Sequence, residues 1–310
     1  MLTLGSLERR ELEARLAGPG LDLCTGPYVT RLRAPIASVA DGLQLLYADY
    51  PVLADGQFAD FHISLLPSAG LRRWYKPQVH FRHDGHVVFR PLPQAHAFPM
   101  FEWGMNWCVS SHANDHLIVH AAVLEKAGAA VILPAPPGSG KSTLCATLAH
   151  RGWRLLSDEL ALVRLSDGLL TPLPRPISLK NASIDLMRSY LATPEQGEPV
   201  LSRPVSDTSK GTVAHLKAPA TAVARAGEAA RPAWIIFPTW EAGSEARLTP
   251  LSSAAAFTGV AQNAFNYSLT AARGFTVLGE LVDACGCYAF RYSRLDDALA
   301  VFDQLPRETP

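Results

Sequence analysis

The most reactive side chains of this sequence lie in two short stretches, separated by one predicted helix. The first is VILPAPPGSGKSTL, residues 131–144, which places Lys141 and Ser142 after a run rich in glycine and proline. The second is RLLSDELAL, residues 154–162, which places Asp158 next to a glutamate. A lysine, a hydroxyl and two carboxylates are groups that can bind a triphosphate with Mg²⁺ and accept a proton from an attacking hydroxyl.

The first stretch resembles a phosphate-binding loop, in which backbone N–H groups and the N-terminus of the next helix bind phosphate oxygens. The apolar run AAVIL precedes it, and STLCATLAH reads as the helix that follows. Ala135 stands where the pattern has its first glycine, and an alanine fits there if its φ angle is negative. The alternative is a glycine-rich turn with a chance lysine. We expect a nucleoside triphosphate site formed by Pro137, Gly138, Ser139, Gly140, Lys141, Ser142 and Thr143.

Asp158 and Glu159 follow a strand that begins at Arg154, one helix after the loop. A right-handed crossover would make this strand parallel to the strand before the loop, so both would end at the same edge of the sheet. Asp158 would then accept the proton of an incoming hydroxyl, while Glu159 and Ser142 hold Mg²⁺. The residue types leave the two carboxylates interchangeable, so Asp158 is also a candidate metal ligand. The alternative is that both residues end a strand at the surface.

Two further residues are candidates for the same site. His120, in LIVHAAVLE, has the pattern of a buried core histidine, but beside a phosphate loop its imidazole could contact the γ-phosphate. Lys210, in SDTSKGTVAHL, would bring a second cation to the phosphates from a mobile segment within residues 192–232. Arg175, Lys180 and Arg203 are other candidates for that cation, and solvated surface charges are the alternative for each.

The segment HAAVLEKAGAAVILPAPPGSGKSTLCATLAHRGWRLLSDELAL resembles the catalytic core of the HPr kinase/phosphorylase family, and most of all its HprK-related kinase A subgroup. The resemblance covers residues 116–165 closely and the remainder loosely. It implies a fold akin to phosphoenolpyruvate carboxykinase, ATP with Mg²⁺, phosphorylation of a serine in a small protein or peptide, and assembly into a homo-oligomer. By position, His120 matches the family histidine, Gly138 to Thr143 the loop, and Asp158 with Glu159 the acidic pair.

The chain departs from this family at two points. The family has an aspartate where this chain has Glu159, and the PGRN-like signature before the late strands is missing. Both departures weaken the expectation of the reverse reaction, phosphorolysis of phosphoserine, and give no ground for naming HPr as the substrate. We predict an ATP-dependent, serine-type kinase. A small-molecule kinase with the same core and a non-catalytic ATP-dependent switch are the alternatives.

Composition limits the other functional classes. The 310 residues are 48% apolar and 18% charged, which is typical of a globular protein. Lys plus Arg equal Asp plus Glu at 28 each, so no net field favours nucleic acid or acidic lipid. No run of about 18 apolar residues predicts a membrane span, and MLTLGSLERRELEARL lacks the apolar core of a signal peptide. The five cysteines show no zinc-type spacing, so reduced thiols and a cytoplasmic location are expected.

The elements that must position these residues alternate in type along the chain. Residues 20–95 predict short strands, with a hairpin at Asp84-Gly85, and a helix follows over 98–108. From residue 115 onward, apolar strands alternate with helices. We therefore predict an α/β fold. A P-loop kinase core resembling HPr kinase and phosphoenolpyruvate carboxykinase would span 115–310, and a small β-rich N-terminal domain with a linking helix would span 1–114.

Overall fold

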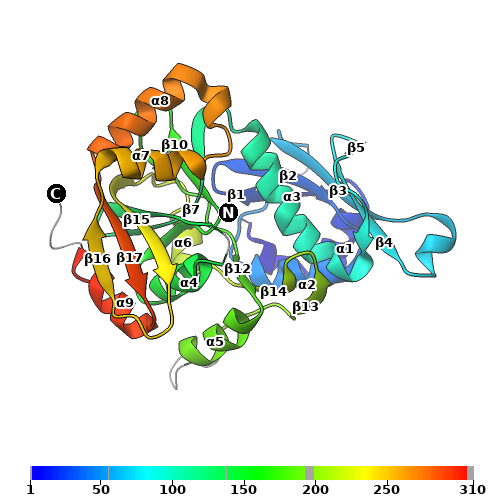
Figure 1. The fold of residues 1–310 in the computed structure, drawn as a ribbon. Coiled ribbons are helices and arrows are strands. Elements are labelled where there is room, and N and C mark those ends of the chain that lie inside the picture. The colour runs from blue at the N-terminus through cyan, green and yellow to red at the C-terminus, as the bar shows by residue number, and fades with distance from the viewer. Residues whose placement is uncertain (1, 55, 137, 193–198, 306–310) are drawn as a thin grey trace.

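The computed structural model of the protein describes residues 2–54, 56–136, 138–192 and 199–305. Within these ranges the chain has a mixed α/β fold with three β-sheets, as the α/β prediction required. Figure 1 shows the sheet of the N-terminal residues on one side and the largest sheet on the other. The three-stranded sheet lies between them, near the lower edge of this view.

The N-terminal sheet is built from short, alternating strands, and α3 covers one of its faces. Phe61, Ile63 and Leu65 alternate with more exposed residues, and they pack in one core with Phe101 and Met105 of α3. β2 and β3 pair in parallel, and the other pairs are antiparallel. The elements are η1 (Leu4–Ser6), α1 (Arg9–Ala17), β1 (Leu21–Thr25), β2 (Tyr28–Arg33), α2 (Ala37–Leu46), β3 (Phe61–Pro67), η2 (Gly70–Arg73), β4 (Gln78–His83), β5 (His86–Val87), β6 (Leu92–Pro93), η3 (Gln94–His96) and α3 (Ala97–His112).

The hairpin predicted at Asp84-Gly85 is confirmed. β4 and β5 pair antiparallel, with His83 opposite His86. Asp84 and Gly85 have φ angles of 48° and 80°, which is the backbone that a tight two-residue turn between strands requires.

The largest sheet has the order β11-β10-β7-β8-β15-β17-β16, and β9 pairs with β7 beside β10. β15 lies centrally and pairs in parallel with both β8 and β17. β7 pairs antiparallel with β8, β9 and β10. The strands are β7 (His116–Lys126), β8 (Ala129–Pro134), β9 (Arg154–Ser157), β10 (Leu160–Arg164), β11 (Leu170–Thr171), β15 (Arg231–Trp240), β16 (Arg247–Pro250) and β17 (Gly286–Tyr292).

Helices cover both faces of this sheet, and the alternation along β7 decides which side chains meet which helices. Leu117 and Val119 join a core with α7 (Ser253–Gln262) and α8 (Tyr267–Asp283). Ile118 and Ala122 join the other core, with α4 (Lys141–His150) and α9 (Leu295–Phe302). Figure 1 shows α7 and α8 together and α4 and α9 nearer the opposite side. His120 has the parity of Ile118 and Ala122, so it belongs to the α4 face.

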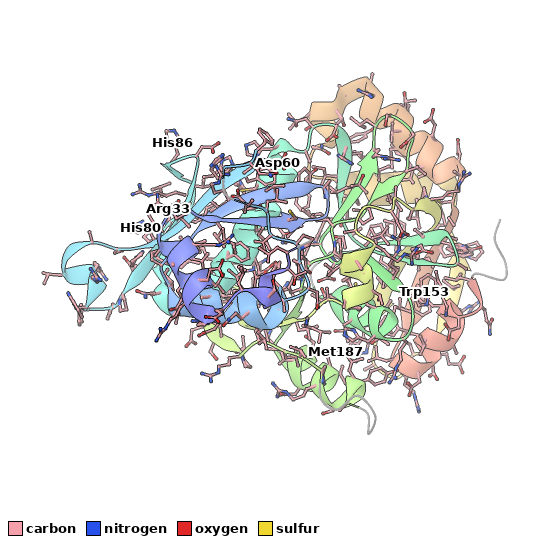
Figure 2. The ribbon with its side chains drawn as sticks, turned by 180° about the vertical axis from the view of Figure 1, so that it is seen from behind. Arg33, Asp60, His80, His86, Trp153 and Met187 are labelled. Carbon is pink, nitrogen blue, oxygen red and sulfur yellow. The ribbon has the colours of Figure 1, made fainter. Side chains whose placement is uncertain are left out.

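Buried side chains hold α4 in place. Leu144 and Leu148 of this helix are fully buried. Trp153, which follows the helix, packs edge-on against Phe302 with ring centroids 6.0 Å apart. Met187 of α5 (Ala182–Leu191) lies in the same core, and Figure 2 labels Trp153 and Met187. These contacts pack α4 between the sheet, α5 and α9.

The three-stranded sheet has the order β12-β14-β13, with all pairs antiparallel. The sequence suggested a mobile segment within residues 192–232, but the described part from residue 199 contains two of these strands and a helix. Residues 193–198 lie outside the described residues. The elements here are β12 (Ile177–Lys180), α5 (Ala182–Leu191), β13 (Val205–Thr208), β14 (Gly211–Leu216) and α6 (Ala220–Ala224). Among the described helices, none combines the length and the apolar character that crossing a membrane requires.

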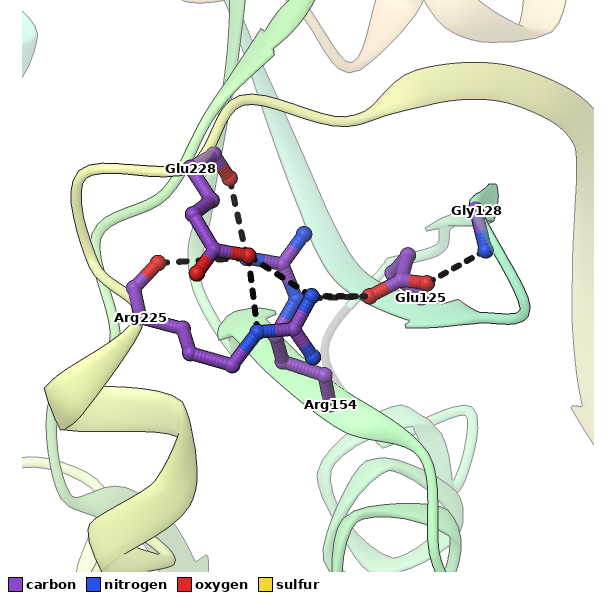
Figure 3. A network of polar contacts seen from close by, with 5 residues as sticks. All are labelled: Glu125, Gly128, Arg154, Arg225 and Glu228. Carbon is purple, nitrogen blue, oxygen red and sulfur yellow. Dashed lines mark hydrogen bonds and ion pairs between the residues drawn. The ribbon is translucent and has the colours of Figure 1, made fainter.

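A network of charges lies at the start of β9 (Figure 3). The Arg154 guanidinium donates to the Glu125 carboxylate at 2.6 Å and to the carbonyl oxygens of Arg225 and Glu228 at 3.1 and 2.9 Å. The second Glu125 oxygen accepts the Gly128 N–H at 2.6 Å. Arg225 pairs in turn with Glu228 at 2.7 Å. These bonds tie the β7–β8 turn to β9 and to the segment after α6.

Candidate functional site

The loop between β8 and α4 has the backbone that its glycines allow. Gly138 and Gly140 have φ angles of 89° and 87°, in the left-handed region that favours glycine. A Cβ atom on Gly140 would lie 2.6 Å from the hydroxyl oxygen of Tyr292, so contact also excludes a side chain there. Ala135 is not among the residues with positive φ, and the condition for an alanine at that position is met. Pro137, the first predicted loop residue, lies outside the described residues.

The N-terminus of α4 has uncapped backbone N–H groups. Gly140 is its N-cap residue, and no side chain of the described residues caps it. Such unsatisfied N–H groups, together with the helix dipole, favour a negatively charged group at this end. Ser139 lies in the turn, and Ser142 and Thr143 form the first turn of α4 directly after Lys141. The arrangement could hold phosphate oxygens.

Lys141 and Asp158 lie together. The Lys141 Nζ donates to the backbone carbonyl oxygen of Asp158 at 3.0 Å, and both side chains are buried. β8 and β9 run in the same direction because each is antiparallel to β7, which lies between them. The loop and Asp158 therefore reach the same edge of the sheet, as predicted. The sequence did not reveal that β7 separates the two strands.

The two carboxylates lie at a break in the β7 ladder. β7 pairs with β9 up to Ser157 and with β10 from Leu160 onward. Asp158 and Glu159 lie between these two strands and have no pairing partner on β7. The Leu160 N–H near the break donates to the Ser157 Oγ at 3.1 Å. A serine directly before the acidic pair thus satisfies a buried backbone donor at the break.

Asp158 is an under-satisfied buried carboxyl group. Its Oδ2 accepts the backbone N–H of Ser178 at 3.3 Å, and the nearby Ser142 hydroxyl also interacts with the carboxyl group. Its buried Oδ1 has no well-formed hydrogen bond among the described residues. Burial raises the pKa of Asp158; the Lys141 charge opposes this rise, and the neighbouring Glu159 charge adds to it. A carboxyl group with a raised pKa and a free oxygen is suited to accepting a proton.

The pKa of Glu159 is shifted in the opposite direction from that of Asp158. Burial alone would raise its pKa, but the hydrogen bond from His120 and the charges of Lys141 and Lys180 outweigh burial and lower the pKa. His120 Nε2 lies 3.1 Å from Glu159 Oε2, so the imidazole contacts the acidic pair itself. The sequence pattern indicated a contact of this ring with the γ-phosphate, as an alternative to a buried core histidine. Adjacent carboxyl groups whose pKa values are pushed apart can divide proton transfer and charge binding between them.

A second cation approaches from the turn of the β13–β14 hairpin. Lys210 lies in this turn, with its Nζ 5.1 Å from the centroid of the Trp103 ring on α3. Desolvation lowers the pKa of Lys210, which the Glu159 charge opposes and the Lys180 charge reinforces. Lys210 therefore lies within electrostatic reach of the acidic pair. It is held by a short hairpin and an aromatic ring rather than by a long loop.

Arg175, another candidate for the second cation, has a different role. Its Nη2 donates to the Asn106 side chain, and its Nη1 lies 3.8 Å from the Glu102 carboxylate. The Tyr47 hydroxyl donates to the other Glu102 oxygen at 2.6 Å. The two Arg175 contacts join α3 to the segment that leads into β12, and the Tyr47 bond joins the end of α2 to α3. Arg175 thus ties the N-terminal helices to the rest of the chain.

Three histidines near the β4–β5 hairpin, His80, His83 and His86, do not come together as ligands of one metal ion would. His80 Nε2 lies 2.9 Å from the Ser68 hydroxyl, while the ring of His83 packs against Trp107. His86 is exposed, and Figure 2 shows it well apart from His80. Among the described residues, no group of three or more His, Cys, Asp or Glu side chains could hold a metal ion. A Mg²⁺ ion that arrives with phosphates needs no such group, because one or two carboxylates are enough.

Sequence reasoning missed two aromatic residues beside the loop. The Tyr292 hydroxyl donates to the Gly140 carbonyl oxygen at 3.2 Å. The Trp240 backbone N–H donates to the Ser139 carbonyl oxygen at 3.0 Å. A signal for Trp240 was available, because it ends an apolar strand, and residues after the carboxyl ends of parallel strands often contact ligands. Nothing in the pattern around Tyr292 indicated its contact.

No protein-family model matches the chain. No curated protein matches its sequence. The interpretation of the site rests on its residues and their arrangement.

Proposed function

We propose that this protein is an ATP-dependent kinase that transfers the γ-phosphoryl group of ATP to the hydroxyl of a serine in a small protein or peptide. The observation that carries the proposal is the buried Asp158 carboxyl, with a raised pKa and one unpartnered oxygen, next to Lys141. An unsatisfied carboxylate in the interior costs free energy, and a site that transfers a phosphoryl group uses such a group to accept the proton of the attacking hydroxyl.

In this proposal the loop, the two carboxylates and Lys210 each have a role in binding ATP. The Lys141 ammonium, the loop N–H groups and the N-terminus of α4 would bind the β- and γ-phosphates. The Ser142 hydroxyl and the ionised Glu159 would hold Mg²⁺, which would neutralise phosphate charge when bound. The pKa of Glu159 is lowered, which suits this role, and Asp158 Oδ1 can contribute as a further ligand. Lys210 would bring the second positive charge that phosphoryl transfer requires.

The transfer step then follows from these positions. The acceptor oxygen bonds to the γ-phosphorus while the bond from that phosphorus to the β–γ bridging oxygen breaks, and ADP leaves. Asp158 takes the proton of the acceptor hydroxyl. Lys141 and Lys210 offset the negative charge on the transferred group. His120 orients the Glu159 carboxylate through its contact at 3.1 Å, which leaves Asp158 as the group available to the acceptor.

The resemblance to the HPr kinase/phosphorylase family supports the choice of a serine hydroxyl. It is carried by the residues that gather here: His120, Lys141 with its loop, Asp158 and Glu159. Because Glu159 replaces an aspartate and the PGRN-like signature is missing, we propose kinase activity without phosphorolysis.

The test is transfer of labelled γ-phosphate from ATP with Mg²⁺ into a lysate of the source cell that serves as the acceptor pool. Wild type is compared with Asp158→Asn and with Asp185→Asn, an exposed aspartate on α5 that pairs with Arg188. We expect a polypeptide labelled on serine with wild type and Asp185→Asn, no label with Asp158→Asn, and ATP binding by all three.

Other outcomes point to the alternatives. Label in small metabolites and in no polypeptide would indicate a small-molecule kinase. No label with wild type, despite measurable ATP binding, would contradict the kinase and favour a nucleotide-dependent switch.

A further inference from the structure

Trp240 is a large aromatic residue left half-exposed beside the loop. It is the last residue of β15, and its side chain is 52% exposed. A Cβ atom built on Gly140 would lie 3.0 Å from the Trp240 Cβ, which measures how closely the residue approaches the loop. The middle of the strand, Ala233 to Ile236, is buried, and its last two residues, Thr239 and Trp240, are exposed. A large aromatic side chain at this exposed end calls for an explanation.

Two hydrogen bonds hold Trp240 in place. Its backbone N–H donates to the Ser139 carbonyl oxygen in the loop, and its indole Nε1, the only polar atom of the side chain, donates to the Ser293 carbonyl oxygen at 3.0 Å. Ser293 follows β17, the parallel neighbour of β15. The polar edge of the ring is therefore satisfied by protein. An indole held in this way keeps its apolar face available without the cost of ordering it on binding.

The order of strands places this ring opposite the acidic pair. In the sequence β7-β8-β15, the loop follows the middle strand, and Asp158 and Glu159 lie on the β7 side. Trp240 ends the strand on the other side. A triphosphate whose γ end meets Asp158 and Lys141 has the β7 side occupied by carboxylates, which repel its remaining phosphates. The nucleoside end is therefore directed toward β15.

We propose that the Trp240 ring is the platform on which the base of the bound nucleotide stacks. This inference rests on the proposed function, and it assigns the part of the site that the phosphate loop does not reach. Bases stack on aromatic rings through their π faces, and every base has such a face. The ring therefore contributes affinity for a nucleoside triphosphate and discriminates little among bases.

The experiment compares ATP with inorganic tripolyphosphate, which has the phosphates and no base. Dissociation constants are measured by titration calorimetry with Mg²⁺ for wild type, Trp240→Ala and Trp240→Phe. Removal of a stacking ring costs about 1–3 kcal/mol per base, so Trp240→Ala should bind ATP about 5- to 150-fold more weakly. Its affinity for tripolyphosphate should not change. Trp240→Phe keeps a π face and should retain most of the ATP affinity.

Trp74 supplies the matched control, because it is 83% exposed and lies in the N-terminal sheet region. Trp74→Ala should change neither constant. An equal loss of affinity for ATP and tripolyphosphate in Trp240→Ala would show that the variant only disturbs the loop. No loss of affinity for either ligand would show that the ring does not contact the nucleotide. Either outcome would contradict the stacking proposal. Failure of wild type to bind tripolyphosphate or ATP would instead refute the phosphate site itself.

Discussion

Charged side chains lie at both ends of strand β9, but they differ in how fully they are hydrogen-bonded. At its first residue, Arg154 is bonded to Glu125 and to two carbonyl oxygens, and both Glu125 oxygens are satisfied (Figure 3). After its last residue, Asp158 has one oxygen without a hydrogen bond among the described residues, and the Lys141 ammonium donates to a backbone carbonyl oxygen instead of a carboxylate. Pairing, rather than the amount of charge, distinguishes a cluster that holds the chain together from one that is ready for a ligand.

The same contrast predicts the sign of a stability change. Removing one partner of a buried, satisfied pair leaves a charge uncompensated and destabilises the fold. Removing a charge that burial already disfavours relieves a cost, because the raised pKa of Asp158 means that the folded state resists its ionisation. Substitutions at the two ends of β9 should therefore act in opposite directions on the free energy of unfolding.

The largest expected effect is on catalysis at the Asp158 end. Asp158→Asn keeps the shape of the side chain and removes the proton acceptor, and positioned general bases contribute about 10²–10⁴-fold to rates. We expect single-turnover phosphoryl transfer to slow by that factor while ATP binding persists. The free energy of unfolding, measured in denaturant, should not fall. A variant that transfers phosphate at the wild-type rate would assign the base to another group, and Glu159→Gln would then be the variant to measure.

The next effect is on stability at the Arg154 end. Arg154→Met leaves the Glu125 carboxylate buried without its main partner, and breaking a buried ion pair of this kind costs about 3–5 kcal/mol. Denaturant unfolding measures this loss, and kcat per folded molecule should be unchanged. Arg225→Met is the control in the same network, because the Arg225 side chain is 47% exposed and exposed pairs contribute about 1 kcal/mol or less. Equal costs for both variants would remove the distinction between the two clusters.

A smaller effect is expected on the free energy of unfolding at low pH, and it comes from one buried histidine. His215 on β14 is fully buried against Phe98, and burial, reinforced by the Arg175 and Lys210 charges and opposed by Glu159, lowers its pKa to about 3. Between pH 6.5 and 3 the unfolded chain binds more protons than the native one, so this residue makes stability fall as the pH falls. The slope is at most about 1.4 kcal/mol for each pH unit.

Unfolding curves measured at several pH values test this assignment. His215→Gln should flatten the acid slope, whereas His86→Gln, at an exposed histidine, should leave it unchanged. Asp158 acts in the opposite sense, since its raised pKa adds stability as it is protonated. A slope that survives in His215→Gln would place the acid-sensitive group elsewhere.

The smallest effect sharpens the comparison at Lys210. Trp103→Leu removes the ring beneath this ammonium, and a cation–π contact is worth about 0.5–2 kcal/mol. We expect kcat to fall about 2- to 30-fold, with stability changing less than in Arg154→Met. Trp74→Leu removes an exposed indole that also lies near a cation, Arg73, and should not alter kcat. An unchanged kcat in Trp103→Leu would mean that Lys210 needs no support from α3.

Local chemistry made one part of this molecule predictable from sequence. The glycines of the loop, the turn at Asp84-Gly85 and the period of the apolar residues each act within a few residues of themselves. The common edge of β8 and β9 also followed, because one helix separates the two strands. These features needed no knowledge of distant partners.

The remainder depended on contacts between distant segments. Arg175 and Lys210 look equally free in the sequence, yet one is bound to Glu102 and Asn106 while the other rests on Trp103. The pattern also did not reveal that β7 lies between β8 and β9, or that Lys210 lies in the turn of a short hairpin. Propensity cannot choose among such partners, because packing across the whole chain decides them.

The hydrogen bond between Tyr292 and Gly140 joins residues 152 positions apart. A chain emerging from the ribosome grows from its N-terminus, so the loop, the acidic pair and the Lys210 hairpin are all synthesised long before the strand that supports Gly140. Until β17 docks, the turn lacks this contact and the last strands of the sheet. The loop should therefore reach its final shape only late in synthesis, when almost the whole chain has been made.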